Sequence, residues 1–238
     1  AMEVLECFIQ KQPLGVTEIS EKLGLYKSNV HNILMTFTAL GYLTQDDETG
    51  KFHLGVSVMT LSRAFREGLD ITRVAVPFMR EIANEAGELI YLTVPKDDSV
   101  IYLEGISPDN QRMVSKSVAG EDCKMYCTAV GKAMLANMPK EEVEKCISGK
   151  LEAYTENTIT DKKSLLEEIE KTRIRGYGID DMEIMFGIKC VGVALLNHDG
   201  KVEGGLSISA PSLRMSDEKI ELYANILKEY AAKIQKML

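Results

Sequence analysis

Apolar residues in the first forty positions recur at helical spacing in three separate segments. They predict short amphipathic helices over residues 2–10, between Gly15 and Gly24, and over residues 26–40. Gly15 is an acceptable N-cap because Glu18 follows three residues later, and Gly24 is typical of a helix end. We therefore expect three helices in quick succession at the start of the chain.

The segment after the third helix has the pattern of a β-hairpin. Residues 42–44 and 51–54 are β-type runs that flank the turn-rich stretch 46–50. Three short helices followed by a hairpin predict a winged helix-turn-helix domain over residues 1–55. Residues 56–69 begin with a further helical pattern, and we expect them to form a linker helix.

Residues 70–238 combine helical and β-type segments, which predicts a second domain. The expected helices cover residues 72–86, 129–136, 140–148, 161–175 and 216–238. The expected strands cover residues 89–94, 100–104, 113–118, 190–196 and 202–209. Strands grouped in hairpins, with helices between the groups, favour an antiparallel sheet flanked by helices. The predicted fold class is α+β, with a winged helix-turn-helix followed by an α/β domain.

The composition is that of an ordinary globular protein, with 45% hydrophobic and 27% charged residues. No apolar run approaches the roughly 18 residues that a membrane helix needs, and no export signal is evident. We therefore expect a cytoplasmic protein without a membrane partner. The net charge is −8, and residues 1–67 hold six Lys and Arg against eight Asp and Glu, so bulk charge does not predict nucleic-acid binding.

Five cysteines in a chain without an export signal predict free thiols. One alternative is a metal- or thiol-responsive regulator, because Cys123 and Cys127 are four positions apart and Cys190 or His198 could join them. Another alternative is an enzyme with Cys190 as nucleophile and His198 as base. That pairing is disfavoured, because eight residues of extended strand separate the two side chains by about 26 Å.

A series of motifs stands in order along nearly the whole chain. The first domain contains residues 16–20 (VTEIS), 27–31 (KSNVH) and 41–43 (GYL). The second contains residues 128–136 (TAVGKAMLA), 158–161 (TITD), 175–181 (RGYGIDD), 187–191 (GIKCV) and 207–211 (SISAP). Together they resemble the IclR family of bacterial transcription regulators. Five ordered motifs in the second domain are more specific than a helix-turn-helix pattern alone.

The resemblance implies a repressor or activator rather than an enzyme, with no cofactor and no metal. Its partners would be double-stranded operator DNA and a small-molecule effector. The effector would bind a GAF-like domain over residues 70–238 and alter operator binding. The resemblance also implies assembly as a homodimer or a dimer of dimers.

The candidate DNA-binding residues lie at the start of the third helix. They are the polar and basic side chains Lys27, Ser28, Asn29, His31 and Asn32, together with Lys51 of the hairpin, which is placed to contact the DNA backbone. Such side chains can reach base edges and phosphates when the helix lies in the major groove. The family often has Arg at the position of Asn32, so we expect modest affinity for each half-site.

The resemblance further implies that eight positions line the effector cavity. They are Cys123, Ala129, Val130, Asp180, Ile188, Cys190, Ser207 and Ser209. Strand alternation predicts that both serines point to one side. Thr128 is placed to cap the following helix, whose free N–H groups would attract a carboxylate, and Asp180 could accept a hydrogen bond from a ligand hydroxyl. Because none of the eight is Lys or Arg, we expect a small organic acid held by neutral donors.

Overall fold

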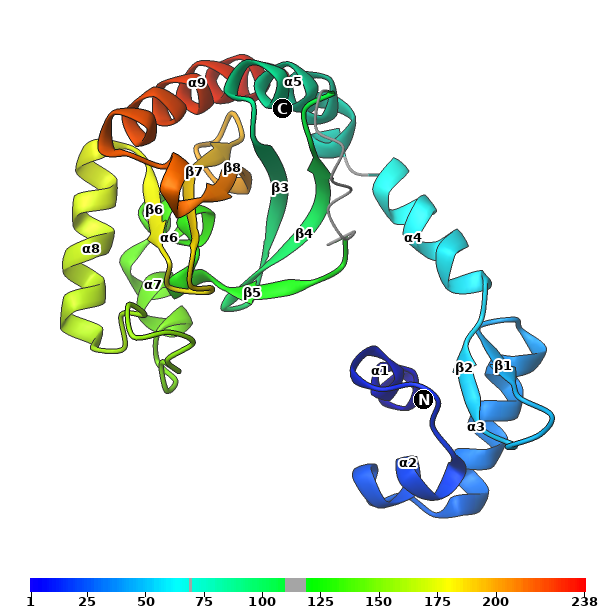
Figure 1. Ribbon diagram of the computed structural model, residues 1–238. Helices are drawn as coiled ribbons and strands as arrows, with labels where there is room; N and C mark the ends of the chain where they lie inside the picture. Colours follow the sequence, from blue (N-terminus) through cyan, green and yellow to red (C-terminus); the bar gives the residue numbers. More distant parts are fainter. Residues whose placement is uncertain (69, 110–118) are drawn as a thin grey trace. The chain divides into compact units, whose positions relative to one another are not determined.

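The structure is a computed structural model that describes residues 1–68, 70–109 and 119–238. The chain folds as two compact units, Ala1–Gly68 and Leu69–Leu238, which are described separately (Figure 1). The strand expected at residues 113–118 lies outside the described residues. In the part of the chain that is described, no helix combines the length and apolar character needed to cross a bilayer.

The first unit consists of helices and a two-stranded hairpin. Its elements are α1 (Met2–Gln10), α2 (Val16–Leu23), α3 (Lys27–Ala39), β1 (Leu43–Gln45), β2 (Phe52–Leu54) and α4 (Ser57–Glu67). The two strands pair antiparallel, with Leu43 opposite Leu54. Leu14, from the connection between α1 and α2, adds a bridge to Phe52. The hairpin is therefore tied to the helices at its base.

The helices of this unit meet around a small apolar core. Ile19, Val30 and Leu34 are fully buried in it, as the helical spacing predicts. The start of α2 is fixed by the backbone N–H of Gly15, which donates to the Glu18 carboxylate at 2.9 Å. These contacts hold α3 by its apolar side and leave its opposite side at the surface.

The second unit is built on one antiparallel sheet. Its helices are α5 (Asp70–Ala86), α6 (Ala129–Leu135), α7 (Lys140–Cys146), α8 (Lys162–Arg175) and α9 (Asp217–Gln235), with 3-10 turns η1 (Met125–Cys127) and η2 (Ser212–Arg214). Its strands are β3 (Leu89–Lys96), β4 (Ser99–Ile106), β5 (Asp122–Lys124), β6 (Gly178–Asp181), β7 (Ile188–Leu196) and β8 (Val202–Pro211). The sheet order is β5-β4-β3-β8-β7-β6, and every neighbouring pair is antiparallel.

Helices cover both faces of this sheet (Figure 1). On one face α5 and α9 lie side by side, and Met79, Ile208 and Leu227 are buried between helices and strands. On the other face α6 packs against β7 and β8, with Val130 and Leu165 in a second core. The predicted α+β class with an antiparallel sheet is confirmed.

Candidate effector pocket and DNA-binding surface

A cavity of about 770 Å³ opens between α6, the sheet and the segment that joins β6 to β7. Its size is within the range of small-molecule sites. Seven of the eight residues proposed for an effector cavity line it: Ala129, Val130, Asp180, Ile188, Cys190, Ser207 and Ser209. Cys123 is not among the lining residues, because it lies on β5, where it pairs with Val100 at the edge of the sheet.

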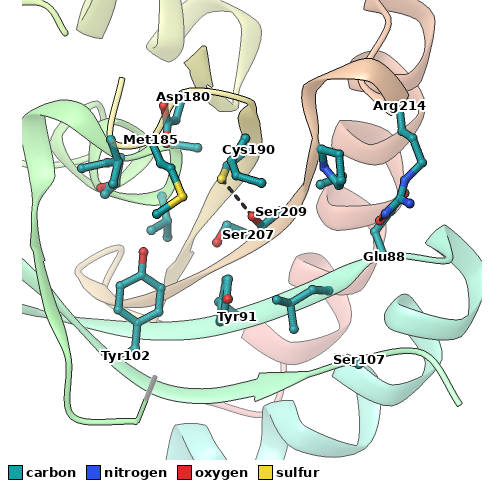
Figure 2. Close-up of a pocket in the computed structure, with 18 residues that line it drawn as sticks. Glu88, Tyr91, Tyr102, Ser107, Asp180, Met185, Cys190, Ser207, Ser209 and Arg214 are labelled. Atoms are coloured by element: carbon teal, nitrogen blue, oxygen red, sulfur yellow. Dashed lines mark hydrogen bonds and ion pairs between the residues drawn. The ribbon is translucent and has the colours of Figure 1, made fainter. Parts of the chain in front are cut away.

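Strands β7 and β8 form the floor of the cavity. Cys190 lies opposite Ser209 and Gly192 lies opposite Ser207, so alternate residues of both strands face the same side. The Cys190 thiol donates to the Ser209 hydroxyl at 3.4 Å (Figure 2). Ile208 points the opposite way, into the core under α5 and α9. The strand alternation predicted for the two serines is therefore present.

Asp180 supplies a buried carboxylate at one side of the cavity. It lies on β6 and is only 4% exposed. Its Oδ1 atom accepts the backbone N–H of Glu183 at 2.6 Å. Burial raises the pKa of Asp180 to about 6, and the hydrogen bond from Glu183 offsets part of that effect. The group can therefore accept hydrogen bonds from a ligand at neutral pH.

An ion pair behind the cavity holds the segment between β6 and β7. Lys132 of α6 pairs with Glu183, and both side chains are almost completely buried. The backbone carbonyl of Glu183 also accepts the Thr158 hydroxyl at 2.6 Å. Ile184 and Met185, the next two residues, form part of the cavity wall. The pair thus fixes a wall of the cavity rather than facing a ligand directly.

Two tyrosines that sequence reasoning missed face the cavity from β3 and β4. The rings of Tyr91 and Tyr102 meet edge to face, with centroids 5.1 Å apart. Burial raises the pKa of Tyr91 to about 12 and also raises the pKa of Tyr102. Both phenols are therefore neutral hydrogen-bonding groups, and Figure 2 shows the Tyr102 hydroxyl directed toward the side of Asp180 and Met185.

A charged pair that the sequence did not reveal also lines the cavity. Arg214 of η2 donates from Nε and Nη2 to the two carboxylate oxygens of Glu88, at 2.7 and 2.6 Å. The Glu88 side chain is 6% exposed, whereas the Arg214 side chain is 53% exposed. None of the eight positions named by the resemblance is Lys or Arg, so Arg214 adds a cation to the wall that those positions do not supply.

The start of α6 lies in the cavity wall and belongs to a short helix. Thr128 does cap the helix, with its hydroxyl accepting the Gly131 N–H at 3.1 Å. The helix has only seven residues, however. A helix dipole accumulates over aligned peptide groups, so a helix this short contributes little long-range attraction.

The cysteine-based alternatives find little support in the geometry. Burial raises the pKa of the Cys123, Cys127 and Cys190 thiols, which keeps them protonated. Among the described residues, no group of three or more His, Cys, Asp and Glu side chains is arranged to hold a metal. His198 lies in the exposed turn after β7, and the extended strand separates it from Cys190.

In the first unit, α3 presents the proposed DNA-contacting residues at its surface. The exposed residues are Lys27, Ser28, Asn29, His31 and Asn32. Lys51 precedes β2 and forms an ion pair with Glu18 at 3.0 Å, so a contact with DNA would compete with that pair. The backbone N–H of Gly15, together with Lys51 and Lys11, holds the pKa of Glu18 at about 2. This carboxylate therefore remains charged under physiological conditions.

Comparison with known proteins identifies the chain. The family described as bacterial transcriptional regulator IclR C-terminal matches residues 64–236, and the IclR helix-turn-helix domain matches residues 1–47. The chain belongs to the IclR family. It is a transcriptional regulator rather than an enzyme, since the IclR-family relatives that it matches are named as regulators and repressors.

Other IclR-family members match over most of their length. The HTH-type transcriptional regulator KdgR of Escherichia coli is 34% identical over 97% of this chain and 88% of its own. The transcriptional repressor IclR of Escherichia coli is 27% identical over 90% of this chain and 80% of its own. The solved IclR structure from Thermotoga maritima is 29% identical, covers 99% of this chain and 95% of its own, and gives a TM-score of 0.75.

Proposed function

We propose that this IclR-family regulator binds a specific operator through α3 and that a small organic acid in the cavity of the second unit changes that binding. The observation that carries the proposal is the two-sided character of α3. Val30 and Leu34 are fully buried, while Asn29 and Asn32 on the other side are exposed. An element held in this way can enter a major groove without unfolding.

Each exposed residue of α3 has a proposed role in DNA recognition. Asn29 and Asn32 can pair with the N6 and N7 positions of adenine, and Lys27 can reach a phosphate or a guanine. Ser28 and His31 add short-range hydrogen bonds, and Lys51 can contact the backbone if its pair with Glu18 opens. The net acidity of the unit implies few phosphate contacts and a shallow salt dependence.

We propose a homodimer or a dimer of dimers acting on cytoplasmic double-stranded DNA. A single α3 reads only a few base pairs, so two copies on a two-fold symmetric site supply the remaining specificity. In the second unit, the residues proposed for effector contact are the seven that line the cavity. Cys123 is proposed to support its wall from β5.

Footprinting on the DNA upstream of the protein's own and neighbouring genes tests the proposal. We expect protection of a two-fold symmetric site and a change in that protection when one organic acid is added. Absence of any protected site would contradict the operator-binding role. Protection that no small molecule changes would contradict the effector role alone.

A further inference from the structure

The cavity is electrically asymmetric. Among the described residues that line it, Arg214 is the one cation, and it lies with Glu88 at one side. Figure 2 shows Asp180 and Met185 on the opposite side, with Cys190, Ser207 and Ser209 between the two ends. A ligand that spans the cavity therefore meets a guanidinium at one end and a carboxylate at the other.

The guanidinium of Arg214 has donors left for a ligand. Its pair with Glu88 uses Nε and Nη2, which form one edge of the planar group. The Nη1 edge makes no contact with Glu88, and about half of the Arg214 side chain is accessible. Glu88 is buried and accepts from two donors, so it fixes the plane of the guanidinium. A guanidinium held in this way is preorganised to bind a second planar anion, such as a carboxylate.

Electrostatics favour one orientation of an acidic ligand. A carboxylate near Asp180 would face a like charge in a buried site, which costs free energy. Hydroxyl groups at that end would instead donate to Asp180 and exchange hydrogen bonds with Ser207, Ser209 and Tyr102. The N–H groups at the start of the short helix α6 are neutral donors, weaker partners for a carboxylate than a guanidinium.

We propose that Arg214 binds the carboxylate of the effector, that Glu88 positions the guanidinium, and that the effector is a hydroxy carboxylic acid with its hydroxyl groups toward Asp180. This inference rests on the proposed function, in which the same cavity binds an effector. It adds a charged contact that the eight positions named from the sequence lack, and it gives the ligand a direction.

A purely structural role for Arg214 gives a different expectation. The pair with Glu88 also ties η2 to the start of β3. If that were its only task, removal of the guanidinium together with the Glu88 charge would weaken charged and uncharged ligands alike. Discrimination between an acid and its amide is therefore the measurement that separates binding from support.

The test titrates full-length protein by calorimetry with three acids and their uncharged amides. The pairs are lactate and lactamide, gluconate and gluconamide, and 4-hydroxybenzoate and 4-hydroxybenzamide. The variants are Arg214→Gln, Arg214→Lys and the double variant Glu88→Gln/Arg214→Gln, which leaves no unpaired carboxylate in the wall and should lose the acid preference as well. The control is Arg73→Gln, which removes one cation from an exposed pair with Asp70 outside the cavity. Thermal unfolding of each variant is measured alongside.

We expect the wild type and Arg73→Gln to prefer at least one acid over its amide. The affinity of Arg214→Gln for that acid should be about tenfold lower than that of the wild type, and its affinity for the amide should stay within about twofold. The affinity of Arg214→Lys for the acid should lie between those of Arg214→Gln and the wild type. Retained acid preference in Arg214→Gln, or equal loss of acid and amide, would overturn the role of Arg214. A wild type that prefers no acid would also overturn it. If the wild type prefers no acid but its footprint changes with an uncharged compound, the role of Arg214 is wrong and the cavity still binds an effector.

Discussion

Neighbouring residues of α3 have opposite surroundings. Asn29 is exposed, whereas Val30, the next residue, has no accessible surface. Residues four positions apart share a helix face, so Val30 and Leu34 pack together into the core and hold the helix in place. Asn29 lies outside this core cluster. Substitution of Asn29 should therefore change DNA binding, whereas substitution of Val30 or Leu34 should change stability.

Asn29→Ala is expected to weaken specific operator binding about tenfold or more, because one good base contact contributes about 1–3 kcal/mol of discrimination. The free energy of unfolding should change by less than about 0.5 kcal/mol, since the residue is exposed. Electrophoretic mobility shifts and denaturant unfolding measure the two quantities. Gln10→Ala, at the exposed end of α1, is the control: it removes an exposed hydrogen bond from Lys22, which contributes little in water, and should leave operator binding unchanged. Equal loss of binding and stability would show that Asn29 is structural.

Asp180 should make the stability of the second unit depend on pH. Its pKa rises from 3.8 to about 6 on folding, because burial disfavours the charged carboxylate. Below about pH 4 the group is neutral and costs no stability, and the cost of the buried charge reaches its full value as the pH rises through 6. Asp180→Asn removes the cost of the buried charge and should raise the free energy of unfolding by about 3 kcal/mol near pH 7.5. The gain should shrink toward pH 5.

Denaturant unfolding at both pH values checks this expectation. Glu156→Gln, in an exposed turn before α8, removes a carboxylate of the same unit without removing a buried charge. It should leave the pH dependence as in the wild type. A gain from Asp180→Asn that is the same at both pH values would contradict the electrostatic explanation.

Among the elements, α6 makes an unusually close approach to the sheet. A Cβ atom at Gly192 of β7 would lie 2.5 Å from the backbone nitrogen of Val130 and 2.7 Å from its Cα. Real side chains do not come that near to backbone, and a backbone contact cannot rotate away. The absence of a side chain at Gly192 therefore lets α6 form one wall of the cavity.

Gly192→Ala is expected to destabilise the second unit by about 3 kcal/mol, because α6 must move away from β7. Scanning calorimetry should show a lower melting temperature for that unit. Gly149→Ala is the matched control, since a Cβ atom there meets nothing within 4 Å. A melting temperature unchanged by Gly192→Ala would mean that α6 adjusts without cost.

Longer elements could be predicted from sequence more reliably than short ones. Residues 2–10 were predicted and observed as one helix, because several apolar positions repeat within it. β5 has three residues and β6 has four, and neither is marked by a turn-rich stretch such as residues 46–50, which revealed the equally short strands β1 and β2. Both strands gain their pairing from a neighbour in the sheet, and that information is not local.

The same limit applies to the candidate site. Motifs placed Cys190, Ser207 and Ser209 near one another because their strands are joined by a recognisable hairpin. Glu88 and Arg214 are 126 positions apart and belong to no shared motif, so only the folded chain brings them together. The charged end of the cavity was therefore invisible from the sequence.

At the scale of the whole molecule, the two units have separate apolar cores. Leu34→Ala should destabilise the first unit by about 3 kcal/mol through the cavity it leaves. Amide hydrogen exchange should quicken in α1, α2 and α3 and stay unchanged in β3, β7 and β8. Leu34→Met is a volume-conserving control and should have a much smaller effect. Faster exchange throughout the sheet would show that the units unfold together.

The two phenols in the cavity wall give the chain a built-in optical reporter. The sequence has no Trp, so tyrosine emission is not masked by energy transfer to an indole, and Tyr91 and Tyr102 contribute two of its nine tyrosines. Occupancy of the cavity should alter the light these rings emit, even when the occupant is colourless. Candidate metabolites can thus be screened on unlabelled protein, before the operator is known.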